Sequence, residues 1–305
     1  MNRRAFLTTA AAAASAATLK AANATTERPF GESAVPLRDT QPLPLGPLPG
    51  SRYPDPHIES LDKRFKGSPG TGGVERVATG FRWAEGRRVS RTELDGSITI
   101  IADKYNGKKL NAPNDAAVAS NGTIWFTDPG YGIKGDYEGL KEPFEQEKQN
   151  VFRVDPKSGD LKVVVDDFVK PNGITFSPDE KKLYVIDTGI TEGQENPAWI
   201  RVFDVDVAAG KLSNSKVFAK DFAPGFTDGM RADTDGNIWC SMGWGDPKED
   251  GVRCYAPGGE LLGKIHIPET VANLCFGGQQ RNRLYICGST SLYAVYTSAR
   301  GAMKP

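Results

Sequence analysis

From about Val74 onward, hydrophobic and polar residues alternate in short runs that turn residues separate. No stretch keeps the 3.6-residue spacing of apolar positions that an amphipathic helix requires. Four times a turn leads into an apolar strand that carries an aromatic residue, at 121–126, 179–184, 235–239 and 281–285. The aromatic residues of these strands are 59, 55 and 46 residues apart: Trp125, Tyr184, Trp239 and Tyr285. Such a repeat, built of several strands, predicts an all-β fold with the blades of a β-propeller.

Each of the first three aromatic strands is followed by a predicted hairpin. The hairpins cover residues 151–165, 200–218 and 252–265, with turns at Ser158-Gly159, Gly210 and Gly258-Gly259. They are expected to form the outer strands of their blades. The last blade has a shorter hairpin, and the apolar run 74–81 is predicted to supply its outermost strand and so close the ring.

A polar residue precedes each aromatic strand at a nearly constant distance of 11 or 12 residues. These residues are Asn114, Asn172, Asp228 and Asn273. The first strand of a propeller blade lines the central channel, so equivalent positions on successive blades converge on one axis. The alternative is that the Asn-Gly and Asp-Gly pairs are only turn residues. The regular offset favours the channel, because turn residues alone need not keep phase.

The first 24 residues predict an export signal. They contain the pair Arg3-Arg4, a short Ala/Thr-rich apolar run and a final Ala-Asn-Ala. The arginine pair indicates the twin-arginine route and a periplasmic or secreted protein. A membrane anchor is the alternative, but the apolar run is short for a span. Residues 25–73, which include His57, are rich in Pro and Gly and predict a tether, and residues 74–305 form the predicted propeller.

The composition of the chain argues against some classes of function and some kinds of metal site. The 38 basic and 38 acidic side chains give a net charge of zero, which excludes a basic surface for nucleic acid. Only two histidines and four cysteines are present, which argues against a multi-histidine metal site. Cys275 and Cys287 lie in apolar strand-like runs, so we expect buried free thiols, with a disulfide after export as the alternative. Trp244, in a Gly-rich loop, is interpreted as a packed aromatic rather than a pocket wall.

The repeated motifs resemble those of the senescence marker protein/gluconolactonase/luciferin-regenerating enzyme-like family of calcium-dependent lactonases. The resemblance runs from Val74 to Tyr296, and its strongest stretches are 110–115, 126–129, 171–179 and 227–231. It implies a six-bladed propeller with one divalent metal at the mouth of the channel. Carried over position by position, the implied metal ligands are Glu85, Asn172 and Asp228.

The chemistry that the resemblance implies is the hydrolysis of a small sugar lactone or ester. Carboxylate and amide oxygens suit Ca²⁺ best, with Mg²⁺ and Mn²⁺ as alternatives and Zn²⁺ as a further candidate. Such a metal polarises the carbonyl and activates water, with Asp228 as general base. Asn114 and Asp115 are the expected substrate contacts. The sequence has no Gly-x-Ser-x-Gly motif for a serine esterase and no phosphate-binding glycine loop for nucleotide chemistry.

One departure from the repeat lies near Glu85. Every other polar residue of the channel has an aromatic strand 11 or 12 residues later, but the corresponding position after Glu85 is Gly96, in the turn of an outer hairpin. About one blade is missing, which predicts five blades or an incomplete ring. Two alternatives to the lactonase follow: a non-catalytic or defective propeller that acts as a binding module, and a hydrolase similar to strictosidine synthase or paraoxonase. The oligomeric state is left open.

Overall fold

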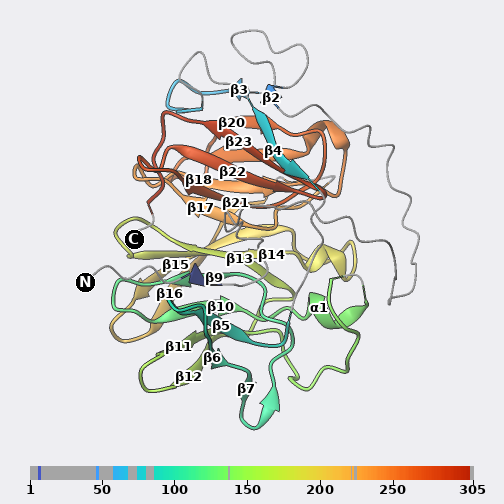
Figure 1. Cartoon of the computed structure of the whole chain (residues 1–305), viewed down its shortest axis with the longest axis vertical. Helices are drawn as coiled ribbons and strands as arrows, with labels where there is room; N and C mark the ends of the chain where they lie inside the picture. The colour runs from blue at the N-terminus through green and yellow to red at the C-terminus, as the bar shows by residue number, and fades with distance from the viewer. Residues whose placement is uncertain are drawn as a thin grey trace.

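Antiparallel sheets stacked in chain order make up most of the molecule (Figure 1). This computed structural model describes residues 6–7, 46–47, 58–67, 74–79, 86–136, 138–220, 222 and 225–302. Four of the sheets have at least four strands, and each of these begins with the inner strand of a blade. The predicted all-β propeller architecture is therefore confirmed.

Two of the blades have four strands each, paired in the order of the chain. One contains β9 (Ala116–Val118), β10 (Ile124–Thr127), β11 (Val151–Val154) and β12 (Leu161–Val165). The second contains β13 (Pro171–Phe176), β14 (Lys182–Asp187), β15 (Trp199–Asp206) and β16 (Lys211–Ala219). The turns of their outer hairpins need a left-handed backbone, which Gly159 (φ 75°) and Gly210 (φ 65°) supply.

The next two blades gain strands from the N-terminal part of the chain, one strand in the first and two in the second. One contains β17 (Met230–Ala232), β18 (Ile238–Met242), β19 (Gly251–Tyr255), β20 (Leu261–His266) and β3 (Ile58–Ser60). The other contains β21 (Val271–Gly277), β22 (Arg283–Gly288), β23 (Ser291–Tyr296), β4 (Glu75–Thr79) and β2 (Gly46–Pro47). Because β4 pairs with β23, the prediction that residues 74–81 supply the outermost strand of the last blade is confirmed.

The aromatic residues of the repeat pack one blade onto the next. Trp125 on β10 meets Phe176 on β13 edge to face, with ring centroids 5.7 Å apart. Trp239 on β18 meets Phe276 on β21 in the same way at 5.6 Å. Both tryptophans are fully buried. The repeat therefore reflects the need of each blade to cover the face of its neighbour.

The first blade is incomplete within the described residues. It consists of β5 (Val89–Thr92) and β6 (Ile98–Ala102), with β1 (Phe6–Leu7) paired to β5. A separate hairpin of β7 (Lys104–Tyr105) and β8 (Lys108–Lys109) follows. Val89 and Ala102 pack on the neighbouring blade, but Ile98 and Ile100 are 61% and 51% exposed. Two large apolar side chains on β6 thus lack the cover that another blade would give, as the missing segment after Glu85 predicts.

The described part of residues 25–73 is more than the predicted tether. Ile58 pairs with Ile265 through β3 and β20. The Phe65 ring lies 5.4 Å from that of Trp239 and close to Gly263, where a side chain would collide with it. Apolar residues in a Pro-rich segment therefore add to the blade core. His57 and residues 1–24, apart from Phe6 and Leu7, lie outside the described residues.

The expectation of buried free thiols at Cys275 and Cys287 is met only in part. All four cysteines are free thiols, and Cys240 and Cys254 are buried. Cys275 is exposed and Cys287 is half-buried, so the prediction of burial is wrong for these two. The preceding residue, Leu274, is buried in the core, and alternation along β21 turns Cys275 to the opposite face. None of the helices in the described part of the chain is long and apolar enough to cross a membrane.

Candidate metal and substrate site

The predicted polar residues gather at one end of the channel. Asn172 and Asn273 lie within the inner strands β13 and β21, while Asn114 and Asp228 come shortly before β9 and β17. The second strand of each blade is antiparallel to the first and therefore ends at this same end. The residues that follow β10, β14 and β18 thus surround the site.

Glycine after the polar residue lets the inner strands approach one another closely. The Gly173 N–H donates to the Asp228 carbonyl oxygen at 2.9 Å, and a Cβ at Gly173 would lie 2.2 Å from that oxygen. The Gly229 N–H donates to the Ala272 carbonyl at 2.8 Å, and a Cβ there would meet the Asn273 amide at 2.2 Å. The alternative that these pairs are turn residues is therefore wrong: their glycines bring the backbones of adjacent blades into contact.

Asn172 has the features of a cation ligand. Its side chain is buried, and its Nδ2 donates to Thr188 Oγ1 at 3.3 Å. Its Oδ1 has no hydrogen-bond partner in the part of the chain that the structure describes. A buried carbonyl oxygen without a donor is rare in proteins, because it forfeits its hydration. A hard cation would satisfy this oxygen, so Asn172 fits the predicted metal.

Asp228 lies just before the neighbouring inner strand, β17, and its backbone is bonded to Gly173, the residue after Asn172. Its backbone N–H donates to Ser241 Oγ at 3.0 Å, and its carbonyl accepts from Gly173. Burial, and to a smaller extent the negative charge of Asp228, raises the pKa of the Tyr131 hydroxyl. Tyr131 begins α1 (Tyr131–Lys134) in the loop after β10. The Asp228 carboxylate is therefore near a phenol from a different blade.

Of the three predicted ligands, Asn172 and Asp228 lie on adjacent backbone segments, and their binding to a metal stays a prediction. Glu85 lies outside the described residues. Among the described residues, this site included, no group of three or more His, Cys, Asp or Glu side chains is placed to hold a metal ion. The candidate set therefore depends on the amide of Asn172 together with the carboxylates of Asp228 and Glu85.

The two predicted substrate contacts differ in their surroundings. Asn114 is half-buried, and its N–H donates to the Thr127 carbonyl. Asp115 is buried, and Arg231 from β17 donates to both of its carboxylate oxygens, at 2.9 and 3.1 Å. The same carboxylate accepts from the backbone N–H groups of Ala116 and Ile174. These contacts join three inner strands and give Asp115 a structural role, while its predicted contact with substrate stays a prediction.

Sequence reasoning missed a polar network next to Asn172. The Tyr131 hydroxyl lies 2.7 Å from Thr188 Oγ1, the group that also anchors Asn172. The Lys170 ammonium lies 4.2 Å from the centre of the Tyr131 ring and pairs with Glu192. Burial lowers the pKa of Lys170, and Glu192 opposes this shift. The position of these residues in the sequence could have indicated the network, since Thr188 directly follows the second strand of its blade and Tyr131 lies in the loop after that of the preceding blade.

Aspartates at the ends of β10 and β14 hold the chain that leads into the site. Asp128 accepts from the Asn111 N–H at 2.8 Å, and Asp187 accepts from the N–H groups of Val169 and Lys170 at 3.1 and 2.8 Å. Each aspartate thus fixes the chain that leads into the inner strand of its own blade, at Asn114 or Asn172. Asp128 is fully buried, and burial raises its pKa to about 7.

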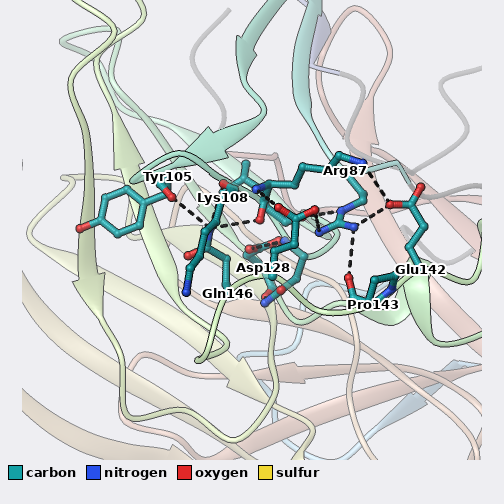
Figure 2. A network of polar contacts seen from close by, with 11 residues as sticks. Arg87, Tyr105, Lys108, Asp128, Glu142, Pro143 and Gln146 are labelled. Atoms are coloured by element: carbon teal, nitrogen blue, oxygen red, sulfur yellow. Dashed lines mark hydrogen bonds and ion pairs between the residues drawn. The ribbon is translucent and has the colours of Figure 1, made fainter.

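Arg87 holds the loops around Asp128 in place, as Figure 2 shows. It donates to the Leu110 carbonyl at 2.7 Å and to Glu142 Oε2 at 2.6 Å. Gln146 donates to three backbone carbonyls of the β7–β8 hairpin segment. The network therefore joins the start of the incomplete blade to the loops of its neighbour, and its contacts are structural.

The fold is that of a β-propeller, with Asn172 and Asp228 on adjacent backbone segments at one end of its channel. The chain belongs to the SMP-30/Gluconolactonase/LRE-like family, whose model matches residues 63–290. It is 29% identical over 259 residues to a gluconolactonase from Zymomonas mobilis, which covers 81% of this chain and 69% of that protein.

Solved structures agree with this assignment. A gluconolactonase from Xanthomonas campestris is 34% identical, with a TM-score of 0.61 over 69% of this chain and 65% of that one. A calcium-binding protein, regucalcin, from Agrobacterium tumefaciens shares the fold, with a TM-score of 0.57 at 18% identity over 79% of this chain and 77% of its own. The chain spans about two thirds of the length of the two gluconolactonases. These relatives support an enzyme of the lactone-hydrolase class.

Proposed function

We propose that this chain is an exported, metal-dependent hydrolase of a small sugar lactone. The observation that carries the proposal is the buried Asn172 Oδ1, which has no donor in the described structure and lies next to Asp228. The gluconolactonase relatives support the substrate class. The twin-arginine motif at Arg3-Arg4 supports export to the periplasm or the medium.

The cation would be held by Asn172, Asp228 and Glu85. Ca²⁺ is the first candidate because all the ligand atoms of these residues are oxygens. When bound, the cation supplies positive charge that polarises the lactone carbonyl and acidifies water. Thr188 orients the Asn172 amide so that its Oδ1 faces away from the hydrogen bond that its Nδ2 makes. Asp228 accepts a proton from the attacking water, and Asn114 hydrogen-bonds the substrate.

The test is a thermal melt of the mature chain in chelator and then in excess Ca²⁺, Mg²⁺, Mn²⁺ or Zn²⁺. A metal at 100 times its Kd stabilises the fold by about 2.7 kcal/mol. For a domain of this size the melting temperature should rise by roughly 5–11 °C. Asn172→Leu and Asp228→Asn should abolish the rise, whereas Asp206→Asn, an exposed carboxylate at the far end of β15, should leave it intact.

Hydrolysis of D-glucono-1,5-lactone, followed by acid release, completes the test. Activity that the effective metal restores, and that both site variants lose, supports the proposal. No melting shift with any metal would overturn the metal dependence. The absence of lactone turnover in a metal-loaded chain would favour the non-catalytic binding module instead.

A further inference from the structure

A stacked aromatic pair stands next to Asp228. The rings of Phe226 and Trp244 lie 4.6 Å apart between centroids and are nearly parallel, with 6° between their planes. Phe226 is half-buried, but 42% of Trp244 remains exposed. The expectation that Trp244 is a packed loop aromatic is therefore only half met, since its partner covers it without burying it.

The backbone fixes this pair to the site. The N–H of Phe226 donates to the Gly243 carbonyl at 3.1 Å, and the reverse bond is 3.2 Å. Phe226 precedes Asp228 by only two residues in the chain, so the pair lies close to Asp228 along the backbone. Trp244 follows β18, which ends where the inner strands begin. The pair therefore borders the mouth at which Asp228 lies.

Trp244 is held in a conformation that bulky residues rarely adopt. Its φ is 61°, in the left-handed region that favours glycine or asparagine. Its backbone N–H donates to Thr270 Oγ1 at 3.5 Å, and Gly243 leaves no room for a side chain next to Thr270. A strained tryptophan at a site edge is a position that the surrounding structure imposes.

We propose that Trp244, supported from behind by Phe226, is the platform on which the ring of the substrate stacks. The pyranose or furanose ring of a sugar lactone has a face of C–H groups that suits the electron-rich face of an indole. The ester end of the substrate would then point toward Asp228 and Asn172. The platform selects cyclic, polyhydroxylated lactones over acyclic esters. This inference rests on the proposed function for the identity of the substrate.

The test compares Trp244→Asn with Trp244→Phe. Asparagine tolerates the left-handed backbone, so Trp244→Asn removes the ring without adding strain. We expect KM for D-glucono-1,5-lactone to rise about tenfold while kcat changes less than about twofold. The reason is that stacking stabilises the bound substrate and the transition state equally. Trp244→Phe should restore most of the affinity. Tyr296→Ala removes another exposed aromatic, at the end of β23 remote from the site, and should leave KM unchanged.

A binding assay separates this inference from the proposed function. The cyclic polyol 1,5-anhydro-D-glucitol and the acyclic D-glucitol lack the ester, and each can be titrated by calorimetry without catalysis. Preferential binding of the cyclic polyol that Trp244→Asn abolishes supports the platform, even if the parent hydrolyses no lactone. If the parent hydrolyses the lactone but Trp244→Asn has the parent's KM and the parent's affinity for the cyclic polyol, the platform is refuted while the lactonase stands.

Discussion

The ion pair between Asp115 and Arg231 gives the sharpest prediction about what holds the channel together. The Asp115 side chain is 2% exposed and that of Arg231 is 18% exposed, and two charge-assisted hydrogen bonds join them. The substitution Arg231→Met keeps much of the side-chain volume and leaves Asp115 as a buried carboxylate whose remaining donors in the described structure are the N–H groups of Ala116 and Ile174. An unpaired buried charge is the costly case.

Breaking a buried pair from one side costs about 3–5 kcal/mol. The partial exposure of Arg231 places the expected loss of unfolding free energy near the lower end, at about 3 kcal/mol. The melting temperature should then fall by roughly 6–12 °C. Urea unfolding followed by tryptophan emission and circular dichroism measures the free energy directly. Because Asp115 also holds the strand of Asn172, the variant should bind the metal more weakly.

Two further variants make this prediction refutable. Arg64→Met removes a partner of Asp62 with a similar pair of bonds, at 3.0 Å each, but this pair is on the surface, so the loss of stability should be much smaller. Adding Asp115→Asn to Arg231→Met removes the stranded charge and should recover a large part of the lost stability. The prediction is refuted if Arg231→Met lowers the unfolding free energy no more than Arg64→Met does. It is also refuted if adding Asp115→Asn recovers none of the lost stability.

Three other outcomes are expected. Gly173→Ala should lower the unfolding free energy by about 3 kcal/mol or more, because its methyl group would collide with the Asp228 carbonyl. Urea unfolding measures this loss, and an unchanged free energy would mean that the inner strands can separate freely. The raised pKa of Asp128, about 7 against an ordinary 3.8, means that its stabilising contribution is complete below about pH 4 and is lost as the pH rises through 7. Asp128→Asn should therefore remove up to about 4 kcal/mol of pH dependence between pH 4 and 8, and an unchanged slope would contradict the assignment. Phe65→Ala should cost about 2 kcal/mol in unfolding experiments by uncovering Trp239, and no loss would show that the N-terminal segment adds nothing to the blade.

The sequence by itself determined the repeating part of this protein. A blade is a local unit, so the spacing from Asn114 to Trp125 and from Asp228 to Trp239 already encodes an inner strand, a turn and an aromatic strand. The hairpin turns were predictable because Gly159 and Gly210 stand where the backbone must be left-handed. The incomplete first blade followed from a break in the same spacing after Glu85.

Only the tertiary structure decided how side chains from different blades meet. Asp115 was expected to contact substrate, but its ion pair joins residues 116 positions apart, which no local pattern reveals. The stacking of Trp244 on Phe226 and of Phe65 on Trp239 likewise depends on strand register and on glycines that admit a neighbour. The repeat in the sequence therefore places polar groups at the channel, while burial and pairing across blades decide which of them hold the fold and which face a ligand.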